Sequence, residues 1–172
     1  TLLYTVTFML AYLLPFQLQR DAGLSPAGAG AFMTAQPATM AVIAPLSGAI
    51  ADRWGPRLPS SLGMLAIAGG MAAVAGTAQA PGAPLVLSLA LVGLGAGLYV
   101  APNSALIMGA APKDRQSTAA AMAATARNLG MTLGIAIAAS LEHAIGFRHA
   151  LFVAAALGAA GTVLGAVRPV SS

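Results

Sequence analysis

The sequence predicts an all-helical membrane protein, and three observations support this fold class. Hydrophobic residues make up 58% of the 172 residues, charged residues only 7%, and the mean hydropathy is +0.84. Eight basic and four acidic residues cannot cover the surface of a soluble domain of this length. The apolar residues fall instead into segments of about 20 residues, long enough for a helix to span a hydrocarbon core of about 30 Å.

Composition also argues against several other classes of function. Without cysteine, the chain has no disulfide and no thiolate metal site. The net charge of +4 comes from basic residues that mostly flank apolar runs, as topology signals do, so no nucleic-acid partner is expected. His143 and His149 stand near Glu142 at a turn, where a surface role is expected rather than a metal site. The sequence shows no nucleophile–base pair that would indicate an enzyme.

The first half of the chain contains three apolar runs. A polar Gln-Arg-Asp triplet ends the first run. Ser25 and Pro26 have the pattern of an N-cap and a first helical residue, so the second helix begins there. A charged loop is then expected at 52–59, before the third run. The expected helices cover about residues 1–18, 26–51 and 60–77.

The second half has a similar arrangement. A turn rich in proline and glycine at 79–84 precedes the fourth run, and a second charged loop at 112–115 precedes the fifth. Glu142 and Arg148 lie around the short turn before the sixth run. Short connections make neighbouring helices antiparallel, so the six helices form one bundle. The expected helices cover about residues 85–108, 116–141 and 150–167.

Basic residues predict the orientation of this bundle, because cytoplasmic loops carry an excess of Lys and Arg. Only Arg20 and Arg148 lie on one side. The opposite side holds Arg53, Arg57, Lys113, Arg115 and Arg168. We therefore expect a protein of the cell (inner) membrane, surrounded by lipid, with both ends of this segment in the cytoplasm.

Small residues at four-residue spacing predict where helices approach closely. Gly93 and Gly97 form such a pair in the fourth helix, and Gly130 and Gly134 form another in the fifth. A chain rich in alanine and glycine also produces such spacings by chance. The longer stripe in the fifth helix, which includes Ala126 and Ala138, argues against chance there.

The loop between the second and third helices concentrates charge and turn-forming residues. Asp52 lies at the end of a helix, where an acid is unfavourable against the helix dipole. This suggests a partner on another helix, and a contact made in one conformation and broken in another. The alternative is a solvated loop whose arginines only set topology. The residues of this expected gating loop are Gly48, Asp52, Arg53, Gly55 and Arg57.

This Gly-x-x-x-Asp-Arg-x-Gly-x-Arg pattern resembles motif A of the major facilitator superfamily, which marks the loop between the second and third helices of a six-helix half. The segments 14–26, 44–48 and 126–134 are similar to the C-terminal half of 14-helix drug:proton antiporters of the EmrB/QacA multidrug-exporter type. Pro56 departs from the motif, which often has a basic residue there. The resemblance implies two inverted three-helix repeats and a second, N-terminal half that this chain lacks.

Polar residues inside apolar runs are the candidates for lining or gating a transport cavity, because an unpartnered amide in hydrocarbon costs several kcal/mol. For Gln17 the alternative is a position at the level of the lipid headgroups. For Asn103, beside Pro102, the alternative is a local hydrogen bond between its amide and the backbone. Arg127 lies twelve residues after Arg115, about 18 Å along a helix, and so within membrane depth. The alternatives for this side chain are a pathway or gating role, snorkelling toward the cytoplasm, or bonding to carbonyls at the bundle interface. The full set is Gln17, Gln36, Asn103, Arg127 and Asn128.

No Asp or Glu lies clearly inside any apolar run. By the resemblance, the chain is part of a proton-coupled exporter of drugs or other small amphipathic compounds, which works by alternating access. The coupling carboxylate then lies in the absent half, and the proton gradient, not a cofactor, supplies the energy. The alternatives are another major facilitator permease with a different substrate, or a membrane scaffold that transports nothing.

Overall fold

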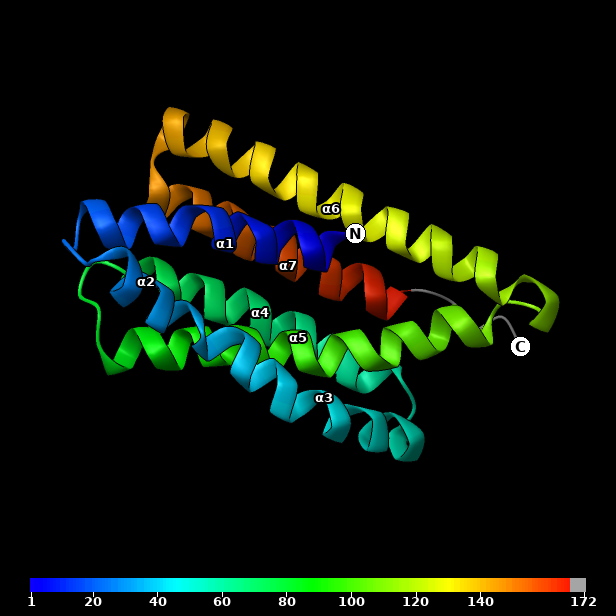
Figure 1. Ribbon diagram of the computed structural model, residues 1–172. Helices are drawn as coiled ribbons and strands as arrows, with labels where there is room; N and C mark the ends of the chain where they lie inside the picture. Colours follow the sequence, from blue (N-terminus) through cyan, green and yellow to red (C-terminus); the bar gives the residue numbers. More distant parts are fainter. Residues whose placement is uncertain (168–172) are drawn as a thin grey trace.

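A computed structural model describes residues 1–167, and within this range every regular element is a helix, which confirms the all-helical fold class. The long helices lie side by side in one bundle (Figure 1). Arg168, one of the expected cytoplasmic charges, lies outside the described residues. The elements are α1 (Leu2–Arg20), α2 (Pro26–Met33), α3 (Ala35–Trp54), α4 (Arg57–Thr77), α5 (Ala83–Gly109), η1 (Lys113–Arg115), α6 (Gln116–Ile145) and α7 (Phe147–Val167).

Three of the described helices are long and apolar enough to cross a membrane by length and composition: α1, α4 and α5. The helices α3, α6 and α7 lie alongside them in the same bundle (Figure 1). That α3, α6 and α7 also span a membrane therefore stays a prediction.

The second expected helix, over 26–51, is wrong as a single element. It is broken at Thr34 into α2 and α3. The cause is Pro37, which has no N–H to donate to the carbonyl of Met33 and whose ring crowds that carbonyl. Thr34 adapts to the break, because its N–H donates to Gly30 O at 3.2 Å and its hydroxyl donates to Ala31 O at 2.7 Å.

The charged loop expected at 52–59 is also shorter in the structure. Helix α3 continues through Asp52 to Trp54, and α4 begins at Arg57, so only two residues connect them. Gly55 ends α3 with a φ of +79°, a left-handed conformation that favours glycine. Pro56 then has a φ of −74°, which already suits the start of a helix.

The turn before the last helix is also shorter than expected and consists of a single residue. Helix α6 runs four residues past its expected end, to Ile145, and Gly146 with a φ of +78° reverses the chain into α7. The N–H of Gly146 donates to Glu142 O at 3.1 Å and closes the last turn of α6. Glu142 is thus part of a helix, whereas the charged residues around the turn had suggested that it lies in a loop.

The way the helices pair has the symmetry of two repeats. Helix α1 packs on α6, α5 packs on α3, and α4 packs on α7. Exchanging α1 with α5, α3 with α6 and α4 with α7 turns the first contact into the second and leaves the third unchanged. The two members of each exchanged pair run in opposite directions (Figure 1). Two inverted three-helix repeats produce this arrangement.

The apolar core lies between α1, α4, α5 and α7. Its largest buried side chains include Leu10 and Leu13 of α1, Met71 of α4, Leu89 of α5 and Leu151 of α7. In contrast, the buried residues of α6 are only Gly130, Gly134 and Ala138, and that of α3 is only Ser47. Helices α3 and α6 are therefore edge helices that contact the bundle along one narrow face.

Glycines determine how closely α5 is packed. A Cβ on Gly93 or Gly97 would collide with α3, at Gln36 O and at Ile43, respectively. A Cβ on Gly95 would collide with Gly63 O of α4. Two residues along an α-helix turn the side chain through about 200°, so alternate glycines face opposite neighbours. Helix α5 is consequently held closely between α3 and α4.

Helix α6 approaches α1 in the same way. A Cβ on Gly130 would meet Thr1 O and the Tyr4 Cβ, and a Cβ on Gly134 would meet Thr5 O. The four glycines expected to pack helices therefore lie at two helix pairs, α5–α3 and α6–α1, which the repeat symmetry exchanges.

Buried hydroxyl groups are satisfied within their own helices, as a lipid environment requires. Thr7 donates to Leu3 O at 2.9 Å, Ser47 to Ala44 O at 2.8 Å and Ser88 to Pro84 O at 2.8 Å. Within residues 1–167, no buried side-chain nitrogen or oxygen lacks a hydrogen-bond partner.

Replacing Gly134 with alanine tests the α1–α6 contact. We expect Gly134→Ala to lower the free energy of unfolding by about 1–3 kcal/mol, because the new methyl group meets the backbone of α1. Thermal unfolding in detergent measures the loss. The matched control is Gly69→Ala in α4, where the nearest atom is Leu91 Cδ2 at 4.0 Å, so the methyl group fits. Equal destabilisation by both substitutions would contradict the close approach.

Candidate functional site

An open cleft of about 250 Å³ lies between the start of α1, the last third of α5 and the first third of α6. Its polar lining consists of Tyr4, Asn103, Ser104 and Arg127, with the N-terminal Thr1. The remaining lining is apolar: Ile107, Met108, Ala120, Ala123, Ala124 and Ala126. Two of the five candidate polar residues, Asn103 and Arg127, thus come together from different helices.

Arg127 is the charged member of this lining. It is exposed on α6, and its guanidinium carbon lies 6.0 Å from the centre of the Tyr4 ring, in the range of a cation–π contact. It follows Arg115, the last residue of η1, by twelve residues, about 18 Å along the axis of α6. Within residues 1–167 no acid pairs with Arg127. Its charge therefore remains available to a group entering the cleft.

Asn103 lies in α5 directly after Pro102, which is buried. Its side chain is half-buried, and no hydrogen bond to it occurs within the described part of the chain, so local backbone satisfaction is not what holds it. The neighbouring Ser104 does bond locally, donating to Val100 O at 2.8 Å. The amide of Asn103 is thus free to bind water or a ligand.

The other three candidates lie elsewhere. Gln17 donates to Asp21 Oδ2 at 2.5 Å, near the C-terminal end of α1. Gln36 lies where α3 crosses α5, and its backbone carbonyl packs against Gly93. Asn128 is exposed on α6 beside Arg127 but is not part of the cleft lining.

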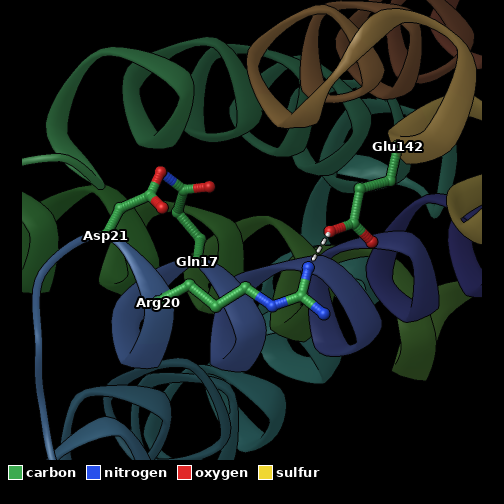
Figure 2. Close-up of polar contacts among 4 residues, drawn as sticks. All are labelled: Gln17, Arg20, Asp21 and Glu142. Atoms are coloured by element: carbon green, nitrogen blue, oxygen red, sulfur yellow. Dashed lines mark hydrogen bonds and ion pairs between the residues drawn. The ribbon is translucent and has the colours of Figure 1, made fainter.

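A second polar group closes the opposite end of the α1–α6 pair (Figure 2). Arg20 Nη1 lies 3.6 Å from Glu142 Oε1, and the two side chains are 71% and 26% exposed. The Arg20 guanidinium carbon also lies 5.7 Å from the centre of the Phe16 ring. This ion pair joins the two helices that Gly134 packs together further along.

The sequence contains a signal for this ion pair. Arg20 and Glu142 lie at the ends of two apolar runs, and the expected topology already places both residues on the same side. Opposite charges there are candidates for pairing, but only the packing of α1 on α6 brings these two together. Tyr4 and Ser104 are the missed residues of the cleft, and Ser104 adjoins Asn103 in an apolar run.

The residues of the expected gating loop lie at the junction of α3 and α4. This junction is at the end of the bundle opposite the Arg20–Glu142 ion pair (Figure 1). Asp52 and Arg53 are exposed in the last turn of α3. Asp52 forms no ion pair or hydrogen bond within residues 1–167, although it faces an unfavourable helix dipole. Gly48 has no atom within 4 Å of the position a Cβ would occupy, so α3 has room beside it for another helix.

Within the described range, no three His, Cys, Asp or Glu residues come close enough to hold a metal ion. His149 Nδ1 lies 3.0 Å from Ile145 O, a local contact within the α6–α7 turn.

Apolar helices long enough to cross a membrane, packed through glycine-mediated crossings, are typical of an integral membrane protein. A family model described as Major Facilitator Superfamily matches residues 1–170. The chain belongs to the Major Facilitator Superfamily.

Three relatives with assigned names are similar to it. The chain is 35% identical over 140 residues to "Riboflavin transporter RibZ" of Clostridioides difficile, covering 80% of the chain and 30% of that relative. It is 33% identical over 147 residues to "Uncharacterized transporter YebQ" of Escherichia coli, covering 84% and 32%. It is 28% identical over 141 residues to "Multidrug resistance protein Stp" of Mycobacterium tuberculosis, covering 82% and 26%. The chain thus spans about a third or less of the length of these curated relatives.

A double-mutant cycle on Arg20→Gln and Glu142→Gln tests the ion pair in Figure 2. We expect a coupling energy of about 0.2–1 kcal/mol, because Arg20 is mostly exposed and water screens the pair. Unfolding in detergent at low and high salt measures this energy, and high salt should reduce it. Arg148→Gln with Glu142→Gln is the control, since no ion pair joins those two residues. Equal coupling in both cycles would contradict the assignment.

Proposed function

We propose that this chain forms the C-terminal six-helix bundle of a 14-helix, proton-coupled exporter of small amphipathic compounds. The observation that carries this proposal is the cleft, where Asn103 and Arg127 come together from different helices and neither forms a hydrogen bond or ion pair with the described residues. In the orientation expected from the sequence, Arg127 lies at membrane depth. Charged and amide groups at such depth are costly unless they face a water-filled path or a partner. The relatives named as a multidrug resistance protein and as transporters support the same reading.

The partner of this bundle is the N-terminal bundle of the same transporter. Helices α3 and α6 are edge helices, with Val42 and Leu46 of α3 and Leu129 and Leu133 of α6 exposed. Lipid or a second bundle covers these faces. Together with the open space beside Gly48, the two edges provide the surface on which a second bundle rocks during alternating access.

Orientation and coupling follow from the charges. The excess of basic residues at the α3–α4 junction and at η1 supports a cytoplasmic location for that end of the bundle, in the cell membrane. The four acids of the chain lie at or just beyond helix ends and not within apolar helix interiors. The carboxylate that couples export to the proton gradient therefore belongs to the N-terminal bundle, and no cofactor is needed.

Transport by the full-length protein tests this function. Everted vesicles from an efflux-deficient host should accumulate fluorescent drugs when a proton gradient is imposed, and an uncoupler should abolish the accumulation. Vesicles without the transporter are the control. The relative named as a riboflavin transporter supports one alternative, uptake of a planar aromatic compound, which whole-cell riboflavin uptake would reveal. Absence of both activities despite confirmed membrane insertion would leave the non-transporting scaffold.

The unpartnered Asp52 generates a second prediction. Asp52→Asn should lower the export rate about 10- to 100-fold, because a charge-assisted hydrogen bond to the other bundle is worth about 1.5–3 kcal/mol. Thermal stability should remain that of the wild type, since Asp52 is exposed and forms no ion pair or hydrogen bond within the described residues. Asp114→Asn is the matched control, because Asp114 is exposed and lies 3.8 Å from the adjacent Arg115. Wild-type export rates in Asp52→Asn would refute the contact.

A further inference from the structure

We propose that the cleft selects planar aromatic anions, with Arg127 binding the acidic group of the ligand. This inference rests on the proposed function, because it assumes that the cleft faces the transport pathway. It goes further by naming the chemical class that the site prefers.

The first step is the charge of the lining. Arg127 is the charged side chain that lines the cleft, and none of the four acids of the chain is among the lining residues. Asp21 and Glu142 lie at one end of the bundle, while Asp52 and Asp114 lie in or beside the other end. Within the described residues, no acid forms an ion pair with Arg127. Its charge attracts an anion and repels a cation.

The second step is the geometry of the guanidinium group. Tyr4 lies against Arg127 at 6.0 Å from ring centre to guanidinium carbon, which restrains the side chain without using up its N–H donors. Arginine presents five donors in a planar fork that matches a carboxylate or another planar anion with two parallel hydrogen bonds. Tyr4 also gives a planar ring system an aromatic surface on which to pack.

The third step is the size and the remaining polarity of the cleft. A volume of about 250 Å³ is near the lower limit of small-molecule sites, which suits one end of a ring system rather than a whole drug. Asn103 offers an amide donor and acceptor, and Ser104 offers an acceptor because its proton is donated to Val100 O. Ile107 and Met108 supply apolar contact for the flat faces of the ligand.

A matched pair of dyes tests the preference. Fluorescein and rhodamine 6G share the xanthene ring, but the first is an anion and the second a cation at neutral pH. Binding of each dye to the purified full-length transporter in detergent is measured by fluorescence anisotropy. The variants are Arg127→Gln, Arg127→Lys and Asn103→Asp. The control is Arg115→Gln, which removes the same charge outside the cleft.

We expect the wild type to bind fluorescein more tightly than rhodamine 6G. Arg127→Gln should weaken fluorescein binding about tenfold, the loss of one charge-assisted interaction, and should leave rhodamine 6G binding unchanged or stronger. Arg127→Lys should retain part of the fluorescein affinity, and Arg115→Gln should retain all of it. Asn103→Asp should shift the preference toward rhodamine 6G by adding a carboxylate to the lining.

Tighter binding of rhodamine 6G by the wild type, binding of neither dye, or equal loss of both dyes in Arg127→Gln would overturn the inference. If Arg127→Gln does not fold, Arg127→Lys and Asn103→Asp decide the question. The binding assay is separate from transport. Fluorescein binding that depends on Arg127 without any transport would therefore support the site and count against the exporter. Transport of rhodamine 6G without fluorescein binding would support the exporter and overturn the site.

Discussion

Close contact between helix backbones at glycine is the constraint on which this bundle depends. Lipid tails are as apolar as the side chains, so burial of apolar surface does not drive helices together as it does in water. Helix α5 meets α3 through Gly93 and Gly97 and meets α4 through Gly95, while α6 meets α1 through Gly130 and Gly134. These contacts leave no room for a methyl group. They determine which helices are neighbours, and therefore which polar residues meet.

The cleft is a consequence of this packing. Gly130 seats the start of α1 against α6, which brings Tyr4 beside Arg127. The last third of α5 then faces the same space and contributes Asn103. At the other end of the α1–α6 pair, Arg20 and Glu142 join the same two helices (Figure 2). One helix pair thus carries an ion pair at one end and, toward the other end, the charge of Arg127, which pairs with no acid within the described residues. The ion pair contributes to structure, and the charge of Arg127 is available for recognition.

Boundaries and sites differed in how well residue patterns foretold them. The apolar runs located the long helices, but a charged residue proved a poor sign of a loop. Asp52 and Glu142 both lie inside helices, because Gly55 and Gly146, with their positive φ angles, are what end those helices. Pro37 was visible in the sequence, yet its effect is a break at Thr34, one turn earlier, where its missing N–H leaves a carbonyl unbonded. The polar candidates were selected for depth alone, which cannot distinguish Asn103 from Gln17.

The sequence by itself determined that the protein is a helical membrane bundle, how many apolar segments it contains, which glycines allow close approach, and the family pattern at the α3–α4 junction. These follow from composition and from spacing along one helix, which are local properties. Only the tertiary structure decided that α1 pairs with α6 and α5 with α3, because many pairings satisfy the same small-residue stripes. That choice placed Arg127 with Tyr4 and Asn103 and left Gln17 with Asp21 at the opposite end. A site made by three helices exists only once their contacts are chosen.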